Sequence, residues 1–319
     1  MTDLDDLIRG AWDLHCHCYP ELSLEHRARQ DDVEMVSAIA SRGMAGVVLK
    51  SHLWPTPARA YYLQRHVPGI RVMSSITLNR IVGGLDPFAV EAAARLGAKV
   101  VFFPTWSARN DQQKNGISAV IRRAIPGSPI DSAPGLVVAE RGRLTDGARA
   151  VLDVARAFDL VVFTGHVSVE ESLLICAAGR ERGLGVVFSH PASPIVGASL
   201  EAMRTAADMG AYIEFTCLQM MSLRHPLPPR QVAETIEALG DDHCVLTTDA
   251  FNAWVPPEPE LLRWGVGVLR ECGVPERSLR HLIVDNPRTL LGLDGRAQAA
   301  DARLPEAASR PADDPATSR

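Results

Sequence analysis

The fold is decided by a short alternating stretch near the start of the sequence, Ala11-Trp12-Asp13-Leu14-His15-Cys16-His17-Cys18-Tyr19-Pro20. Its polar side chains Asp13, His15 and His17 recur every second residue, which is the period of a β-strand. Residues two apart share one face of a strand, so the two imidazole groups point the same way and can hold a single divalent cation. Alone, the pair is also compatible with a solvated strand face, and the rest of the chain has to decide.

Seven further apolar runs follow, and each leaves room for a helix before the next. These runs lie at residues 46–52, 70–78, 99–105, 160–166, 185–190, 211–216 and 244–249. Apolar strands that alternate with helices are typical of a parallel sheet covered on both faces. Eight such units over roughly 290 residues predict a distorted (β/α)8 TIM barrel. An open, doubly wound sheet is the competing architecture, because periodicity does not reveal whether a sheet closes.

One long segment interrupts the pattern after the fourth strand, at about residues 106–144. Its front part, 108–132, is polar and rich in Gly, Asn, Gln and Pro, which predicts a loop, and 135–144 predicts a small hairpin. Because loops after barrel strands lie on the catalytic face, we expect a lid-like insertion, with surface decoration as the alternative. Residues 1–295 are expected to form one domain and 296–319 a disordered tail.

Composition narrows the class of protein. The chain has 319 residues, of which 46% are hydrophobic and 22% charged, and a formal net charge of −5 without a basic block, so we expect no nucleic-acid partner. The first residues are acidic and no long apolar run exists, so neither a signal peptide nor a membrane span is expected. Six cysteines scattered through apolar segments indicate reduced thiols and a cytoplasmic protein.

The chemistry-bearing side chains gather at the ends of the predicted strands. They are His15 and His17, Lys50 and His52, His166, His190, and Asp249. In a barrel the carboxyl ends of all strands meet at one rim, where active sites lie. Imidazole and carboxylate groups predict a divalent metal, zinc by default, with manganese, iron or nickel as alternatives and one or two ions. A metal activates water, and Asp249 can act as both ligand and acid–base group.

This set of strand ends resembles the amidohydrolase superfamily over about residues 10–293. Members carry His-x-His at the end of strand 1, a His at the ends of strands 5 and 6, and an Asp at the end of strand 8. The resemblance implies a metal shell, with Asp249 as acid–base catalyst, made of His15, His17, His166, His190 and Asp249. Residues 284–293 also resemble the Asn-Pro-x-x-Leu-x-Gly helix that often closes these chains. The implied activity is hydrolysis of an amide, lactam, lactone or related bond in a small molecule.

One departure concerns strand 4, which ends Phe103-Pro104-Thr105-Trp106 without the carboxylated Lys or the Glu that bridges the ions of two-metal members. Lys50 is the candidate replacement, and a partner for a substrate carboxylate or a supporting role beside the metal are its alternatives.

Other polar side chains are weaker candidates. His52 is a candidate ligand-like neighbour or substrate contact, and Arg80 and Arg109 are candidate anchors for an anionic substrate, with solvated surface positions as the alternative. Glu214 is a candidate inward-facing residue on strand 7. Asp13, two residues deeper on strand 1, is expected inside the barrel or beside the ligands.

Other functions stay open at this point. A non-oxidative decarboxylase resembling aminocarboxymuconate semialdehyde decarboxylase would also lack the strand 4 ligand and use one zinc ion. A PHP-type phosphoesterase would end in Asp-x-His, whereas here the sequence is Asp249-Ala250-Phe251. A TatD-like nuclease would need a strand 4 Glu and a basic surface, and a purely structural metal is the non-enzymatic alternative. The expected partners are a small-molecule substrate and, in a homo-oligomer, further copies of the chain.

Overall fold

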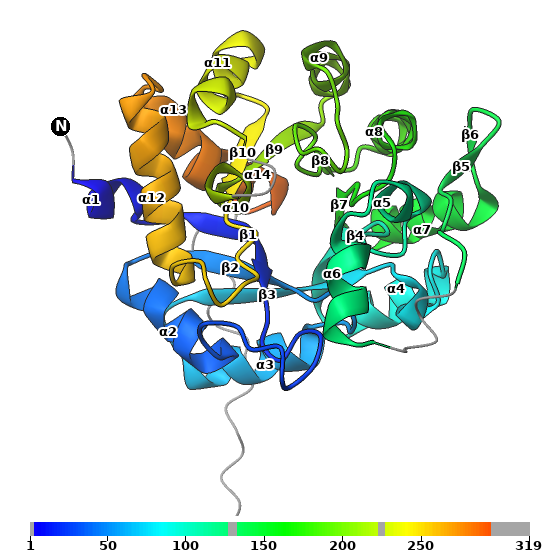
Figure 1. Cartoon of the computed structure of the whole chain (residues 1–319), viewed down its shortest axis with the longest axis horizontal. Coiled ribbons are helices and arrows are strands. Elements are labelled where there is room, and N and C mark those ends of the chain that lie inside the picture. Colours follow the sequence, from blue (N-terminus) through cyan, green and yellow to red (C-terminus); the bar gives the residue numbers. More distant parts are fainter. Residues whose placement is uncertain (1–2, 127–132, 223–226, 295–319) are drawn as a thin grey trace, which may run out of the picture.

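The computed structural model describes residues 3–126, 133–222 and 227–294. Its centre is a sheet of eight parallel strands that pair in chain order. The strands are β1 (Trp12–His17), β2 (Gly46–Lys50), β3 (Arg71–Thr77), β4 (Ala98–Phe102), β7 (Val161–Phe163), β8 (Val186–Phe188), β9 (Tyr212–Thr216) and β10 (Cys244–Thr247). At the carboxyl end β10 meets β1, because Asp249 N donates to His15 O at 2.9 Å and His17 N to Ala250 O at 3.2 Å. The predicted barrel is confirmed, and the alternative prediction of an open, doubly wound sheet is wrong (Figure 1).

Helices surround the sheet, one after each strand (Figure 1). The surrounding helices are α2 (Asp32–Ser41), α3 (Pro57–His66), α4 (Pro87–Arg95), α7 (Asp146–Ala157), α8 (Val169–Arg182), α9 (Leu200–Asp208), α11 (Pro229–Leu239) and α12 (Glu258–Glu271). Capping residues fix where several begin: Asp31 and Glu34 form a capping box on α2, and Ser168 and Glu171 form another on α8. These boundaries are therefore encoded locally.

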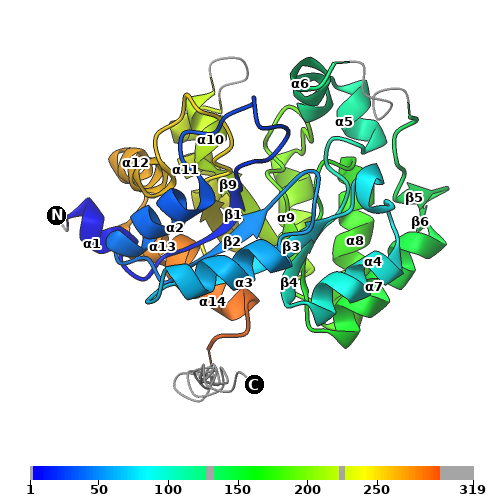
Figure 2. The same cartoon turned by 90° about the horizontal axis from the view of Figure 1, so that it is seen from below.

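Shorter elements complete the chain. They are α1 (Leu4–Ile8), η1 (Arg80–Val82), α10 (Cys217–Met221), α13 (Glu276–Arg280), the π-helix η3 (His281–Asp285) and α14 (Asn286–Leu290). Leu290 and Leu291 pack with Trp12 and Val245 inside the barrel, so α14 covers its amino end. Figure 2 shows α14 at the opposite end of the barrel from α5 and α6. In the described residues, no helix combines the length and apolar character needed to cross a membrane.

The insertion after β4 is more ordered than a loop. It contains helices α5 (Arg109–Gln113) and α6 (Ile117–Ala124) and a hairpin of β5 (Ala139–Glu140) and β6 (Arg143–Leu144). The hairpin was expected, but the loop predicted for 108–132 is wrong where these helices lie. The apolar side chains Ile117, Val120 and Ile121 explain α6, since this spacing gives a helix one apolar face. Residues 127–132 and the predicted tail 296–319 lie outside the described residues.

A β-bulge in β1 changes which side chains face the barrel interior. The register between β1 and β2 shifts between Asp13 and Cys16, so two residues of β1 face one residue of β2 there. His15 contacts the interior ring of Phe102, with centroids 5.2 Å apart. Asp13 instead faces the helical layer, where its carboxyl group meets that of Glu258 on α12. Of the two positions expected for Asp13, the barrel interior is therefore wrong, whereas the place beside the ligands agrees with the structure, because Asp13 Oδ1 accepts a hydrogen bond from His15 N at 3.1 Å.

Candidate metal centre

Five buried histidines lie side by side at the carboxyl end of the barrel, supplied by β1 and by the residues that follow β2, β7 and β8. They are His15, His17, His52, His166 and His190. Neighbouring ring centroids in this group lie 4.6 to 6.4 Å apart. The structure thus brings all five predicted histidines to one place, although they come from four different parts of the sequence.

One group of candidate ligands joins the first and last strands of the barrel. Asp249 Oδ1 lies 3.1 Å from His15 Nε2 and 3.1 Å from His17 Nε2. Ligand atoms of these three residues all lie within 4.8 Å of one another, a spacing that one divalent cation can span. Two imidazole nitrogens and one carboxylate oxygen are a donor set that suits zinc and other first-row metals. His166 and His190 are not part of this group and form the adjacent wall.

Three of the histidine rings are held by a carboxylate at Nδ1. The pairs are His15 Nδ1 with Glu214 Oε1 at 2.8 Å, His17 Nδ1 with Glu21 Oε2 at 3.0 Å, and His166 Nδ1 with Asp111 Oδ2 at 2.6 Å. A carboxylate only accepts hydrogen bonds, so Nδ1 carries a proton in each pair and Nε2 is the nitrogen that a cation would take, in the case of His15 by displacing the second proton that its raised pKa retains. This is the arrangement that metal-binding histidines have in proteins. The residues present therefore fit a metal ion.

The other two rings meet hydroxyl groups. His52 Nδ1 lies 3.0 Å from Thr105 Oγ1, and His190 Nδ1 lies 3.4 Å from Ser193 Oγ. Burial and the neighbouring His166 lower the pKa of His190 to about 3, and burial with Lys50 holds the pKa of His52 well below its ordinary value. Both rings are neutral near pH 7, the form in which imidazole binds metals.

The remaining charges explain how the group is held together. Burial alone would raise the pKa of Asp249, but His15 and His17 outweigh it and keep the pKa well below its ordinary value. Burial and Lys50 lower the pKa of His15, but Asp249 and Glu214 outweigh them and raise it to about 9. Asp249 is consequently a carboxylate over the whole working range of most enzymes.

Lys50 reaches the same group from the end of β2. Its side chain is buried, with Nζ 2.7 Å from His15 Nε2 and 4.9 Å from the ring centre of Phe102. Burial lowers its pKa, against the opposing effect of Asp249. At the end of β4, Thr105 binds His52 and Asn79 instead of offering a charged ligand.

Arg80 and Arg109, the expected substrate anchors, are not brought to the histidines. Arg80 is exposed and donates through Nη2 to Pro134 O in the insertion. Arg109 lines a separate cavity of about 280 Å³ between α5 and α8, together with Gln113 and Arg141. Arg80 therefore lies against the insertion from outside it, and Arg109 lies within the insertion at a separate cavity.

Some residues around the histidines were not expected from the sequence. Glu21 and Asp111 hold His17 and His166, but both come from segments without a strand-end signal. Glu21 lies four residues after its histidine, whereas Asp111 and His166 are 55 residues apart. Only Glu214, which alternates with Tyr212 on β9, was recognisable as an inward-facing candidate.

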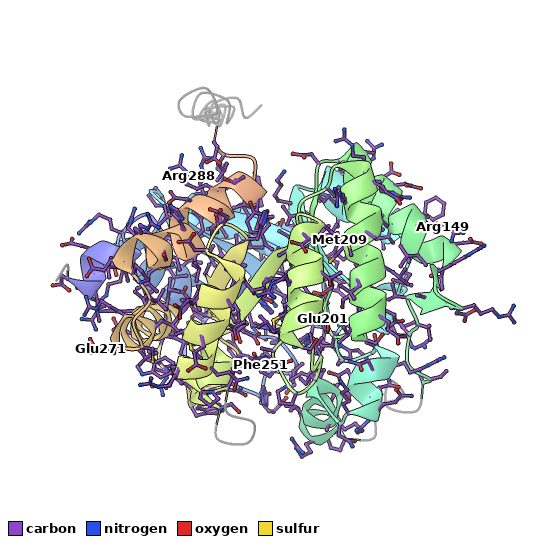
Figure 3. The ribbon with its side chains drawn as sticks, turned by 90° about the horizontal axis from the view of Figure 1, so that it is seen from above. Arg149, Glu201, Met209, Phe251, Glu271 and Arg288 are labelled. Carbon is purple, nitrogen blue, oxygen red and sulfur yellow. The ribbon has the colours of Figure 1, made fainter. Side chains whose placement is uncertain are left out.

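A separate apolar cluster covers the histidines. It consists of Leu22, Trp106, Ile121 and Phe251, which come from the segments after β1, β4 and β10. The Phe251 ring lies 4.9 Å from that of His17 and 5.5 Å from that of His52. Figure 3 shows Phe251 at the opposite end of the molecule from Arg288 on α14. At this rim the polar histidine group is therefore bordered by apolar side chains.

Comparison with solved structures identifies relatives of the fold. An amidohydrolase from Pseudomonas aeruginosa matches 91% of this chain and 98% of its own with a TM-score of 0.63 at 12% identity. A probable dipeptidase from the same organism matches 91% and 96%, with a TM-score of 0.60 at 13% identity. A 2,6-dihydroxybenzoate decarboxylase from Rhizobium matches 90% and 100%, with a TM-score of 0.53 at 12% identity. These similarities show that the chain shares the fold of the matched amidohydrolase, dipeptidase and decarboxylase structures.

Sequence comparison places the chain more narrowly. Curated proteins gave no match. The profile of one family, described as a family of unknown function, matches residues 10–214, from the strand that carries His15 and His17 to Glu214 on β9. That span is more than half of the sequence, and the chain therefore belongs to the DUF6282 family.

Proposed function

We propose that this protein is a metal-dependent hydrolase that cleaves an amide, lactam, lactone or related bond in a small molecule. The observation that supports this most is the group of His15, His17 and Asp249, whose histidine rings are oriented by Glu214 and Glu21. His15, His17 and Asp249 would hold the ion, with His166 and His190 as further ligands. A bound divalent cation supplies a Lewis acid, which lowers the pKa of water to about 7 and polarises a carbonyl group.

Asp249 is the residue that moves the proton. It is ionised, and its side chain is 16% exposed, whereas those of His15 and His17 are 1% and 2% exposed. It is thus the member of the group that a water molecule and a substrate can reach. Asp249 accepts a proton from the attacking water and delivers it to the departing nitrogen or oxygen as the bond breaks.

The apolar cluster beside the histidines indicates the character of the substrate. Leu22, Trp106, Ile121 and Phe251 form this cluster, and Lys50 is the only lysine or arginine that contacts the histidine group among the described residues. Burying apolar surface against such a cluster contributes about 25 cal/mol per Å². We infer a substrate with an apolar body and at most one negative charge.

Asp249→Asn tests the proposal. The purified chain, loaded with Zn²⁺, is assayed against a panel of lactones, lactams and N-acyl amides, and its metal content is measured. We expect hydrolysis by the wild type and a loss of about 10²- to 10⁴-fold in kcat/KM in the variant, because the acid–base group is gone. Asp241→Asn, in the separate cluster of Asp241, Asp242 and His281, is the matched control and should change nothing. Full activity of Asp249→Asn, or of chelator-treated wild type, would refute the proposal.

A non-oxidative decarboxylase is the second candidate. The end of β4 lacks a charged bridging ligand, and a 2,6-dihydroxybenzoate decarboxylase shares the fold. Hydroxybenzoates added to the substrate panel distinguish the two functions, since a decarboxylase would release carbon dioxide from them. The metal content also separates them, because two ions per chain, with Lys50 as a bridging ligand, would argue against a one-zinc decarboxylase.

A further inference from the structure

The short helix α5 holds His166 from two sides. Asp111 Oδ2 accepts a hydrogen bond from His166 Nδ1 at 2.6 Å. The preceding side chain, Asn110, donates through Nδ2 to the backbone oxygens of His166 and Ile195, each at 2.9 Å. Both the ring and the backbone of His166 are therefore fixed by residues of the insertion.

Asp111 also fixes the start of α6. Its Oδ2 accepts from Ile117 N at 3.0 Å and its Oδ1 from Ser118 N at 2.8 Å. The first amides of a helix have no partner within the helix itself, so this carboxylate satisfies two of them. Asp111 is fully buried, and a Cβ atom at Gly116 would overlap its carboxylate. One carboxylate, held in one position, is thus shared between α6 and His166.

The same segment reaches the loop that follows His190. Lys114, which caps the end of α5, donates through Nζ to Val196 O at 2.7 Å, next to Ile195. The insertion therefore spans the two loops that carry His166 and His190. The residues in these contacts are 55 to 85 positions apart in the sequence, so the contacts depend on the tertiary structure.

We propose that Asp111 is a positioning residue of the metal centre and that α5 and α6 become more ordered when a metal binds. This inference rests on the proposed function and adds a coupling between the insertion and one ligand. Asp111 keeps the proton of His166 on Nδ1 and leaves Nε2 to face a cation. Coupling is reciprocal, so a cation that holds His166 also favours the arrangement in which Asp111 caps α6. The insertion is then a clamp on the site.

Asp111→Asn tests this, because an amide offers one acceptor oxygen where a carboxylate offers two. It cannot serve both Ser118 N and His166 Nδ1. We expect the affinity for Co²⁺, measured by calorimetric titration, to fall roughly 10- to 100-fold. We also expect the visible absorption of bound Co²⁺ to change as His166 is lost from the coordination shell. In wild type, Co²⁺ should slow amide hydrogen exchange in residues 109–124, and in the variant it should not.

Two further variants make the result specific. Gly116→Ala displaces the Asp111 carboxylate without removing it and should cause the same losses. Gln113→Ala changes an exposed side chain of α5 and should cause none, and circular dichroism checks that every variant is folded. If Asp111→Asn binds Co²⁺ with wild-type affinity and spectrum, the inference is wrong while the proposed function stands. A wild-type chain that binds no Co²⁺ overturns both.

Discussion

At the scale of single residues, the buried carboxyl groups of Asp13 and Glu258 behind β1 differ in charge. Asp13 accepts hydrogen bonds from His15 N and Thr248 N, each at 3.1 Å, and from the Thr248 hydroxyl group. No donor in the described part of the chain reaches either oxygen of Glu258. Burial raises the pKa of Glu258 well above its ordinary value, and the adjacent Asp13 raises it further. Glu258 therefore keeps its proton and shares it with Asp13.

This division of charge predicts a pH-dependent stability that Glu258→Gln removes. The unfolded chain loses the Glu258 proton above about pH 4.5, whereas the folded chain keeps it to a much higher pH. The stabilisation is complete below the lower pKa and is lost as pH rises through the folded one, with a limiting slope of about 1.4 kcal/mol per pH unit. Urea unfolding of metal-free protein between pH 5 and pH 9, at intervals of about one unit, should show this fall in wild type and a flatter profile in Glu258→Gln. Glu271→Gln, an exposed change on α12, should keep the wild-type slope, and parallel profiles for all three proteins would contradict the assignment.

At the scale of elements, the pairing of β1 with β2 depends on a residue without a side chain. Gly46 lies opposite Trp12, and a Cβ atom there would overlap the indole ring inside the barrel. The same two strands carry His15, His17 and Lys50. The register set by this packing at the amino end therefore also sets the position of these side chains along the barrel axis at the carboxyl end.

Gly46→Ala is expected to destabilise the chain by about 1–3 kcal/mol, because interior packing has no room for an added methyl group. Gly267→Ala is the control, since a Cβ there meets only the flexible end of Leu4 at 3.1 Å and alanine favours the helix by up to about 1 kcal/mol. Urea unfolding of the metal-free proteins measures both changes. Equal stability of the two variants would contradict the prediction and would mean that the Trp12 ring can move to accommodate the added methyl group.

At the scale of the whole molecule, the proposed ligands come from segments that only the closed barrel brings together. His17 and Asp249 are 232 residues apart, and the contact between β1 and β10 is what joins them. A cation that needs this geometry binds the folded chain and not the unfolded one. Binding of the proposed metal ion would consequently be linked to folding.

Zn²⁺ should therefore raise the melting temperature of wild type, by a stabilisation of about 2.7 kcal/mol at a free concentration one hundred times Kd. His17→Ala should lose most of this rise, because it removes one of the three residues His15, His17 and Asp249 that would hold the ion. His281→Ala, in the surface cluster with Asp241, should keep it. Calorimetric scans with and without Zn²⁺ measure the difference, and an equal rise in all three proteins would place the binding elsewhere.

The sequence predicts features that local patterns encode, but not contacts between residues that are far apart in the chain. The barrel follows from apolar runs and helix caps, and the histidines could be placed at one rim because each ends a strand. The carboxylates that hold the rings could not, since the pairing of Asp111 with His166 is set by tertiary structure. Strict alternation does not reveal a bulge, so of the two positions expected for Asp13 the barrel interior is wrong, while its place beside His15 agrees with the structure. Arg80 and Arg109 have the charge of substrate anchors but point away from the site.

The clamp formed by α5 has a consequence for how such a barrel can acquire new substrates. Loops on the catalytic face of a barrel are the segments that usually vary as specificity changes. Here an exchange of the whole insertion would remove Asp111 and weaken the metal site along with the old specificity. An apolar position outside the insertion, such as Leu22, carries no such tie. Divergence of this chain, natural or engineered, is therefore expected to proceed by single substitutions in the walls of the site, while the insertion is inherited intact.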